Sequence, residues 1–383
     1  MQCDYYDAGV CRSCTLMGEP YAAQLAGKQD AVAATLAPWV APGCWSDAAP
    51  SRESGFRNKA KLVVGGRKGA PTVGILDAAG RGVDLRHCGL YEQGLHAAVL
   101  DLADRLPASG LTPYDVPTRQ GELKHVLLTH SPAGELMARF VLRSPGQRRR
   151  VGDLVDGLGG RTGPRLRVAS VNLQPEHKAV LEGEAEEVLT ADATLPMPVA
   201  GLTLHLGTRS FFQTNTQVAA ELYRQVAAWV DGLRPGRVWD LYCGVGGFAL
   251  HTSAPGRAVV GVEQSAEAVR SARRSREDPA LQGRAEDTTF VTADATRYAR
   301  ASGPADRPDV LVVNPPRRGI GPDLADWVES SGVPHLVYSS CAASSLARDL
   351  ARMPSYAVRH ARLFDMFPQT RHHEVALLLQ RRR

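Results

Sequence analysis

Short apolar runs alternate with helix-like segments throughout the second half of the sequence. The runs are RVWDLYCG, AVVGVEQS, TFVTADA, DVLVVNPP and HLVYSSC, and segments such as SAEAVRSARRSR separate them. Strands that are buried on both faces read as continuous apolar runs, because the intervening helices cover those faces. The alternation therefore predicts an α/β domain over residues 201–383. Its Rossmann-like, doubly wound parallel sheet would bind ligands at the carboxyl ends of the strands.

The first 200 residues have a different pattern, which is rich in strands. Runs such as FRNKAKLVVGG, APTVGILDA and RLRVASVNLQP are bounded by Gly, Pro and Asp, and HVLLTHSPAGELMARFVLRS predicts a hairpin with its turn at Ser131–Gly134. The basic stretch SPGQRRRVGD, around Arg148–Arg150, is typical of a solvated loop, with an RNA contact as the close alternative. Because 383 residues exceed one ordinary core, we expect two domains, a β-rich one over 1–200 and the α/β one over 201–383.

A glycine turn follows the first strand of the α/β half. Gly244, Gly246 and Gly247 lie between that strand and a helix, and Glu263 ends the next strand about twenty residues later. Glycines let a ligand approach the amide-rich start of a helix, and a carboxylate at that distance can bind ribose hydroxyls. A tight turn beside a helix-capping acid would give the same letters, but the paired placement favours a nucleoside cofactor.

A later strand end distinguishes S-adenosylmethionine from NAD. The NAD fingerprint wants a third glycine where this chain has Ala249, although its looser form tolerates alanine. Asn314 is followed by two prolines and two arginines, a combination that suits holding a planar substrate beside a methyl donor. A stiff proline turn alone would not explain the Asn and the arginines. Asp294 ends another strand, where it could face the adenine or cap a helix equally well.

Cys341 follows the strand HLVYSSC and lies on the same rim. A lone cysteine is most often a small buried residue. Here its neighbours are small and polar, and the helix that follows would stabilise a thiolate at its N-terminal end. A thiolate that adds to uracil C6 makes C5 nucleophilic toward a sulfonium methyl, and a base must then remove the C5 proton. Glu374 is the candidate base; His372 and His373 beside it lack metal-ligand spacing.

Several motifs together resemble the RNA uracil-C5 methyltransferases: QTNTQVAAELY, DLYCGVGGF, NPPRRGI, YSSC with LARDL, and DMFPQTRHHE. MQCDYYDAGVCRSC and FRNKAKLVV are similar to the bacterial branch that acts on uracil 747 of 23S ribosomal RNA. The resemblance spans essentially the whole chain. It implies Cys341 as nucleophile and Glu374 as base. It also implies S-adenosylmethionine contacts at Gln213, Tyr242, Glu263 and Asn314, with Tyr242 acting through its backbone. Together with Gly244, Gly246 and Asp294, these residues make up the predicted cofactor site.

The sequence departs from the wider family at two of these motifs. Many relatives carry Asp where this chain has Asn314, although the 747-type branch resembles this chain in having Asn there. Ala342 stands where an Asn usually follows the nucleophile. The second difference removes any hydrogen bond that such an Asn would make. It leaves the role of the thiol unchanged.

Seven cysteines, an odd number, argue against a disulfide framework. Cys3, Cys11 and Cys14 with a remote fourth thiol could ligate zinc or an iron–sulfur cluster, and spacing alone leaves the two open. The resemblance implies a [4Fe–4S] cluster on these three and Cys88, with Cys44 as the competing fourth ligand. The first domain is thus expected to be an iron–sulfur domain.

The resulting prediction is an S-adenosylmethionine-dependent methyltransferase acting on a uridine of 23S ribosomal RNA. Alternatives are the same chemistry on another uridine of 23S or transfer RNA, or a non-catalytic iron–sulfur protein that binds RNA. An NAD-dependent oxidoreductase is disfavoured because no hydride-transfer residue accompanies the glycine turn. Arg57, Lys59, Lys61 and the Arg148–Arg150 stretch are candidate phosphate contacts.

The charge of the chain agrees with an RNA partner, and its hydropathy argues against a secretory signal or a membrane span. The formal net charge is +5 and the pI is near 8.9, a modest excess that suits a polyanion. The N-terminus has no apolar run typical of a secretory signal, and no stretch approaches the roughly 20 apolar residues of a membrane span. We expect a cytoplasmic protein with no membrane association, and a monomer, since the enzyme must admit a large RNA.

Overall fold

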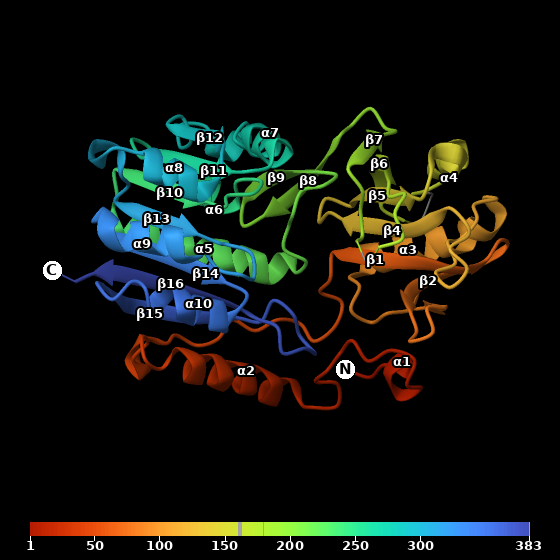
Figure 1. The fold of residues 1–383 in the computed structure, drawn as a ribbon, viewed down its shortest axis with the longest axis horizontal. Coiled ribbons are helices and arrows are strands. Elements are labelled where there is room, and N and C mark those ends of the chain that lie inside the picture. Colours follow the sequence, from red (N-terminus) through yellow and green to blue (C-terminus); the bar gives the residue numbers. More distant parts are fainter. Residues whose placement is uncertain (160–162, 179, 383) are drawn as a thin grey trace. The chain divides into compact units, whose positions relative to one another are not determined.

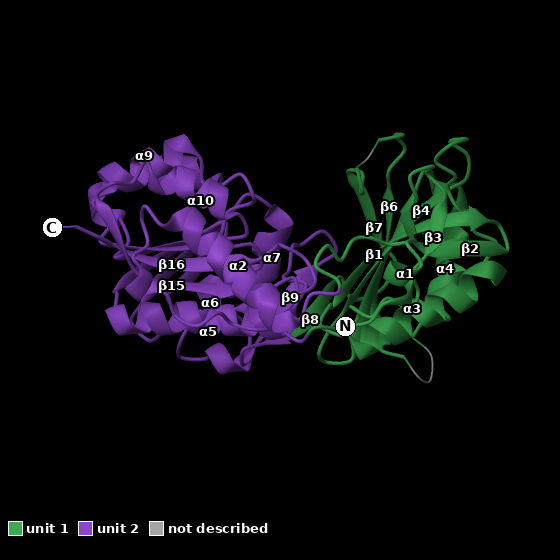
Figure 2. Ribbon diagram, turned by 90° about the horizontal axis from the view of Figure 1, so that it is seen from below, with its two compact units in different colours: residues 1–17, 53–197 green, residues 18–52, 198–383 purple. Residues whose placement is uncertain are grey.

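The computed structural model describes residues 1–159, 163–178 and 180–382. It divides into two compact units, which Figure 2 colours separately: Met1–Met17 with Glu53–Met197, and Gly18–Arg52 with Pro198–Arg383. No helix in the described part of the chain is long and apolar enough to cross a membrane.

The segment Gly18–Arg52 is where this division differs from the expected one, which placed all of residues 1–200 in the first domain. Helix α2 (Tyr21–Leu36) buries Val32 and Leu36 in the core of the second unit. Residues beyond the 3-10 turn η1 (Pro42–Cys44) run parallel to the edge strand β15, with bridges at Trp45 and Ala49. The apolar face of α2 has its partner in the second unit, so the segment packs there (Figure 1).

The first unit is built on a mixed sheet. Its seven strands, counted among the described residues, have the order β3-β2-β1-β4-β5-β6-β7. Strands β4 and β5 form the predicted hairpin, and the Gly134 amide donates to the Ser131 carbonyl in its turn. The apolar sides of α3 and α4 cover one face of the sheet. The elements are α1 (Asp4–Asp7), β1 (Lys59–Arg67), β2 (Ala70–Leu76), β3 (Gly82–Asp84), α3 (Gln93–Arg105), η2 (Leu106–Ala108), β4 (Leu123–His130), β5 (Glu135–Leu142), η3 (Pro145–Gln147), α4 (Arg148–Val155), β6 (Arg165–Leu173) and β7 (Ala185–Val188).

The expectation of a loop at Arg148–Arg150 was wrong, because these residues form the first turn of α4, although they are exposed to solvent as expected. Val151, Leu154 and Val155 supply the buried stripe that makes the segment helical. Arg148 forms a forked ion pair with Glu187, and Arg150 donates to the Gly110 carbonyl at 2.7 Å. Two of the three arginines are therefore engaged within the unit.

The second unit contains the predicted parallel sheet, with the strand order β12-β11-β10-β13-β14-β16-β15. Strands β10 to β14 pair in parallel, and β16 and β15 extend the sheet antiparallel. Its elements are β10 (Arg237–Leu241), α6 (Gly247–His251), β11 (Ala258–Glu263), α7 (Ala266–Ser275), η4 (Pro279–Leu281), β12 (Thr288–Thr292), α8 (Ala295–Ala301), η5 (Pro304–Asp306), β13 (Val310–Val313), α9 (Pro322–Ser331), β14 (His335–Ser340), α10 (Ala343–Leu350), β15 (Tyr356–Phe364) and β16 (Glu374–Arg381). The pair β8 (Thr194–Val199) and β9 (Leu202–Gly207) and helix α5 (Thr216–Leu233) precede it.

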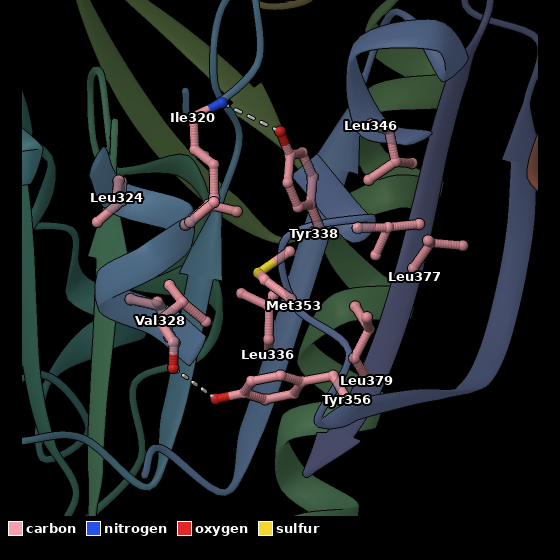
Figure 3. Close-up of a cluster of buried hydrophobic side chains, with 14 of the residues drawn as sticks. Ile320, Leu324, Val328, Leu336, Tyr338, Leu346, Met353, Tyr356, Leu377 and Leu379 are labelled. Carbon is pink, nitrogen blue, oxygen red and sulfur yellow. Dashed lines mark hydrogen bonds between the residues drawn. The ribbon is translucent and has the colours of Figure 1, made fainter. Parts of the chain in front are cut away.

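Helices cover both faces of this sheet. Helices α2, α8, α9 and α10 contribute to one apolar cluster with side chains of β10, β13, β14, β15 and β16. Figure 3 shows part of this cluster, where Leu336 and Tyr338 of β14 lie between α9 and β16. Figure 2 places α5 and α6 on the side of the sheet away from α9 and α10. Because helices cover both faces, the carboxyl ends of the strands are the part of the sheet where a ligand can bind.

Candidate active site

The carboxyl ends of four adjacent parallel strands carry most of the predicted site. Glu263 ends β11, Tyr242 follows β10, Asn314 follows β13 and Cys341 follows β14. These strands are neighbours in the order β11-β10-β13-β14, so the four residues lie along one edge of the sheet. The strand order reverses between β10 and β13, and such a switch point is the usual ligand site in open α/β sheets.

The turn after β10 has the backbone of a tight ligand-binding loop. Tyr242 has a φ of 67°, unusual for a side chain of this size, and Gly246 has a φ of 87°. A Cβ at Gly246 would lie 3.0 Å from the Phe290 ring, so close packing also requires glycine there. The Gly244 amide donates to Glu263 Oε2 at 3.2 Å, which joins the glycine turn directly to the carboxylate on β11.

The two acidic candidates have different surroundings. Glu263 Oε1 also accepts from the Ser265 amide at 2.8 Å, and a carboxylate with two such bonds retains lone pairs for hydroxyl groups. Asp294 is exposed, and its Oδ1 accepts from the Arg297 amide at 2.9 Å as the N-cap of α8. Of the two roles that its position allowed, the helix cap is present in the structure.

Cys341 lies in the bend between β14 and α10 and is partly buried. Burial raises the pKa of its thiol, the charge of Glu374 raises it further, and the Arg317 guanidinium lowers it through its charge and a hydrogen bond. The expected stabilisation of a thiolate by the start of α10 is therefore outweighed. Electrostatic influence between Cys341 and Glu374 shows that the two predicted catalytic groups are close.

Glu374 begins β16 and is almost fully buried. Its neighbour Val375 pairs with Ser340 of β14, which brings the start of β16 to the edge where Cys341 lies. Burial raises the pKa of the Glu374 carboxyl to about 7, although the Ser339 hydroxyl donates to Oε1 at 2.5 Å. A carboxyl with this pKa can accept or release a proton near neutral pH.

The loop that follows Asn314 is hydrogen-bonded to α10 and β14. Asp349 of α10 accepts from the Ile320 amide at 2.9 Å and from the Tyr338 hydroxyl at 2.6 Å. The Ile320 amide also donates to the Tyr338 hydroxyl, a contact drawn in Figure 3. Gly319 has a φ of 85°, and a Cβ there would lie 2.3 Å from Asp349 Oδ2. This anchor holds the stretch that carries Arg317 against the helix that follows the thiol.

Gln213 is buried and lies in the segment that connects β9 to α5. This segment ends at Asn215, the N-cap of α5. Phe211, two residues earlier, is 72% exposed, which is rare for a ring of this size. The stretch therefore presents an aromatic face to solvent beside a predicted cofactor contact.

The four predicted cluster ligands occur together in the first unit. Charges at Cys88, Cys11 and Cys3 all raise the pKa of Cys14, whose burial raises it to about 12. Among the described residues, no group of three or more Cys, His, Asp or Glu side chains has the arrangement of a metal site. Cys44, the rival fourth ligand, lies instead in the second unit, where its thiol contacts the Val358 carbonyl at 3.4 Å.

One basic residue of the first unit, Arg57, lies near two of these thiols, and Lys59 and Lys61 follow it on strand β1. The charge of Arg57 lowers the pKa of both Cys14 and Cys88, and its buried Nε has no hydrogen-bond partner in the described part of the chain. Burial, together with the charge of Lys61, lowers the pKa of Lys59 to about 8. An unpaired buried guanidinium nitrogen near Cys14 and Cys88 suits a negatively charged group held by the thiols.

Some residues that shape the site went unassigned in the sequence. Ser339 acts on Glu374, Arg317 acts on Cys341, and Asp349 holds the loop after β13. They lie in the motifs YSSC, NPPRRGI and LARDL respectively, so their place in these motifs was the sequence signal that could have identified them. Asp240 of β10 is fully buried, burial raises its pKa to about 8, and it accepts from the Ala249 amide at 2.8 Å. Cys243, inside the glycine turn, is buried as well.

Comparison with known proteins identifies the family. The family described as tRNA (Uracil-5-)-methyltransferase matches residues 191–382. The 23S rRNA (uracil(747)-C(5))-methyltransferase RlmC of Edwardsiella ictaluri is 43% identical over 382 residues, or 100% of this chain and 99% of the relative. The protein of the same name from Halothiobacillus neapolitanus is 44% identical over 385 residues, covering all of both chains. The chain belongs to this family.

A solved structure of the tRNA (Uracil-5-)-methyltransferase type has the same fold. The crystal structure of Pyrococcus abyssi tRNA (uracil-54, C5)-methyltransferase with S-adenosyl-L-homocysteine matches with a TM-score of 0.77 and 23% identity, over 96% of this chain and 85% of that one. As a family member the protein is a methyltransferase, and its second unit has the Rossmann-like fold of S-adenosylmethionine-dependent enzymes.

Proposed function

We propose that this protein methylates C5 of a uridine in 23S ribosomal RNA, with S-adenosylmethionine as methyl donor. The observation that carries the proposal is the pairing of a partly buried thiol, Cys341, with a buried carboxyl, Glu374, whose pKa burial raises to about 7. The names of the full-length relatives favour uracil 747 as the target. Their identity over the whole chain supports the same RNA as substrate.

The chemistry assigns one step to each group. The Cys341 thiolate, formed by loss of its proton to solvent, bonds to uracil C6, and the electron pair of the C5–C6 double bond moves into an enolate. C5 then attacks the sulfonium methyl, so that the methyl–sulfur bond breaks and S-adenosylhomocysteine leaves. Glu374 takes the proton from C5; the double bond reforms and the C6–S bond breaks, which frees the thiolate. Arg317 favours the thiolate before addition and after release.

The rest of the edge supports binding of the methyl donor. Glu263, joined to the Gly244 amide, would accept hydrogen bonds from the ribose hydroxyls, and the glycine turn would admit the methionine portion. Gln213, the Tyr242 backbone and Asn314 would contact the donor or the uracil that reacts with it. The target must leave its stack to reach this edge, and the exposed Phe211 ring offers a stacking face for an unpaired base.

A trapped adduct tests the reaction class. The protein is incubated with S-adenosylmethionine and a 23S RNA fragment that contains 5-fluorouridine, and a denaturing gel shows whether protein and RNA are covalently joined. Fluorine cannot leave as a proton does, so we expect an adduct that carries the methyl group and is absent in Cys341→Ala. Absence of the adduct together with absence of methyl transfer to ordinary RNA would refute the proposal.

The target nucleotide is tested separately. Mapping of methylated uridines in 23S and transfer RNA from cells with and without the gene should show one site lost, at uracil 747. Loss at another uridine would retain the chemistry and change the substrate. An unchanged map, with adduct formation absent, would favour a non-catalytic RNA-binding role.

We further propose that Cys3, Cys11, Cys14 and Cys88 hold a [4Fe–4S] cluster. The charges of Cys3 and Cys11 raise the pKa of both Cys14 and Cys88, and this proximity and the unpaired Nε of Arg57 support the proposal. When bound, the cluster would supply a negatively charged cross-link that fastens the N-terminal segment to the turn after β3. These four residues would provide the ligands, and the methyl transfer described above needs no electron from them.

Anaerobic reconstitution with iron and sulfide tests the cluster. We expect about four irons per chain, by analogy with known Cys₄ clusters, and visible iron–sulfur absorption that is lost in Cys88→Ser. Cys44→Ser is the matched control and should retain the absorption, because its thiol lies in the second unit. Zinc without visible absorption would identify a zinc site instead.

A further inference from the structure

Helix α2 carries a buried ion pair that the reaction described above does not use. Lys28 Nζ lies 2.5 Å from Asp365 Oδ1, and the two side chains are 2% and 0% exposed. Lys28 also donates to the Phe367 carbonyl at 3.0 Å, and the Tyr21 hydroxyl donates to Asp365 Oδ2 at 2.9 Å. Burying two charges is expensive, and apolar residues often stabilise such a site equally well. The arrangement therefore indicates a role in fixing geometry.

The geometry concerned is that of the loop before the proposed base. Asp365 is the first residue after β15, and Glu374 is the first residue of β16; Phe364, which precedes Asp365, pairs directly with Glu374. Lys28 and Tyr21 thus fix the hairpin at the end where the base lies. Any shift of the β15–β16 hairpin against β14 would move the Glu374 carboxylate away from its place beside Ser339 and Cys341.

A second pair of hydrogen bonds fixes the middle of the same loop. Gln24 Nε2 donates to Gln369 Oε1 at 2.9 Å, and the backbone N–H of Gln369 donates to Gln24 Oε1 at 3.0 Å. Gln369 has a φ of 66°, a conformation that a side chain adopts only when its surroundings enforce it. Gln24, Lys28 and Tyr21 follow one another at helical spacing on one side of α2, so a single rigid element holds the loop.

The same segment also reaches the stretch that carries Gln213. The Tyr21 hydroxyl accepts from the Ser51 amide at 2.7 Å, and Ser51 Oγ accepts from Asn215 Nδ2 at 2.8 Å. Asn215 caps α5 and lies two residues after Gln213. One hydrogen-bonded path therefore joins the loop of the base to the loop of a predicted cofactor contact through residues from the start of the chain.

We infer that Tyr21, Gln24 and Lys28 form a positioning unit that aims Glu374 at the C5 proton. The inference rests on the proposed function, in which Glu374 acts only after methyl transfer. It assigns to the segment Gly18–Arg52 a part in the release of the methylated RNA, although that segment supplies no group to the reacting atoms. Deprotonation at C5 is sensitive to the position of the base, and small displacements reduce such steps strongly.

The test measures which step slows. Tyr21→Phe removes one hydroxyl, and Gln24→Leu removes both bonds to Gln369 with little change in size. With ordinary RNA, we expect each variant to form the methylated covalent adduct and to release it about tenfold or more slowly than the unaltered protein, by analogy with misplaced catalytic groups. The adduct should then be visible on a denaturing gel without 5-fluorouridine, while kcat and the KM for RNA fall together and kcat/KM stays near its original value.

Val32→Ala is the matched control. Val32 lies on the apolar side of the same helix, 2% exposed, and makes no polar contact with the loop. Its truncation weakens the attachment of α2 without touching the polar unit, so release should stay fast. Adduct accumulation in Val32→Ala equal to that in Tyr21→Phe would overturn the inference in favour of general destabilisation, as would unchanged release in both Tyr21→Phe and Gln24→Leu.

Failure of the proposed function would look different. The unaltered protein would then form no adduct with 5-fluorouridine RNA, whatever the variants do. The unaltered protein could form the adduct with 5-fluorouridine RNA while Tyr21→Phe and Gln24→Leu release ordinary RNA at the normal rate. That result would support the proposed reaction and refute the positioning role. Lys28→Met, which leaves Asp365 unpaired, is followed only where thermal melting shows it folded, and slow release in it would support the inference further.

Discussion

Replacing the buried carboxyl of Glu374 by an amide should change the pH dependence of stability. Burial raises the pKa of Glu374 from 4.5 to about 7, so the folded protein holds this proton more tightly than the unfolded chain. The stabilisation is fully present below pH 4.5, where both states are protonated. It is lost as the pH rises through 7, because the folded protein must then bury a charge. Glu374→Gln cannot ionise and escapes this loss.

The magnitude follows from the two pKa values. Each tenfold difference in proton affinity corresponds to about 1.4 kcal/mol. Ionising Glu374 in the folded protein therefore costs about 3 kcal/mol relative to the unfolded chain, and most of this, about 2–3 kcal/mol, appears between pH 5 and pH 8. Asp240, whose pKa burial also raises, is present in both proteins, so its contribution cancels in the difference.

Urea denaturation at several pH values, followed by tryptophan fluorescence, measures this difference. The chain has five tryptophans, and all lie in Gly18–Arg52 or Pro198–Arg383, so the signal reports on the unit that contains Glu374. We expect the stability of Glu374→Gln relative to the unaltered protein to rise by about 2–3 kcal/mol from pH 5 to pH 8. Glu277→Gln, the same change on the surface, should show no such trend. Parallel pH curves for Glu374→Gln and the unaltered protein would refute the reasoning.

Two further predictions concern the loop after β13. Arg317→Met should shift the alkylation of Cys341 by iodoacetamide to higher pH, because the guanidinium lowers the thiol pKa, whereas Arg318→Met should not; mass spectrometry of the Cys341 peptide measures it. Gly319→Ala should destabilise the second unit by about 1–3 kcal/mol, since the new Cβ combines a positive φ with an impossible contact to a buried carboxylate. Gly321→Ala, also at positive φ but with open space around the Cβ, should cost less, and urea denaturation compares the two.

Local patterns predicted the parallel strands and the edge that carries the site. Strands β10 to β14 are continuous apolar runs, and chemistry-bearing residues follow each of them, so their convergence needed only the rule that parallel strands end together. Strand β15 was absent from the prediction because a bulge between Val358 and His360 breaks its alternation of buried and exposed residues. The segment Gly18–Arg52 was assigned by its position in the sequence, whereas its partners lie more than 300 residues away, as in the pair of Lys28 with Asp365.

Electrostatics of the site were the least predictable part, because they depend on burial and on pairs that the sequence does not show. The helix after Cys341 suggested a lowered thiol pKa, but burial and the Glu374 carboxylate act in the opposite direction. The two groups oppose each other's ionisation, so one negative charge at a time is favoured between them. A protonated Glu374 at the addition step leaves the charge to the thiolate and then to the enolate. Once the thiol sulfur is bonded to C6 it carries no charge, so Glu374 can ionise and accept the C5 proton. Burial raises the pKa of Glu374, and burial with the Glu374 charge raises the pKa of Cys341. These effects match the order of the proposed steps, and Arg317 supplies the opposite charge whenever the thiolate is present.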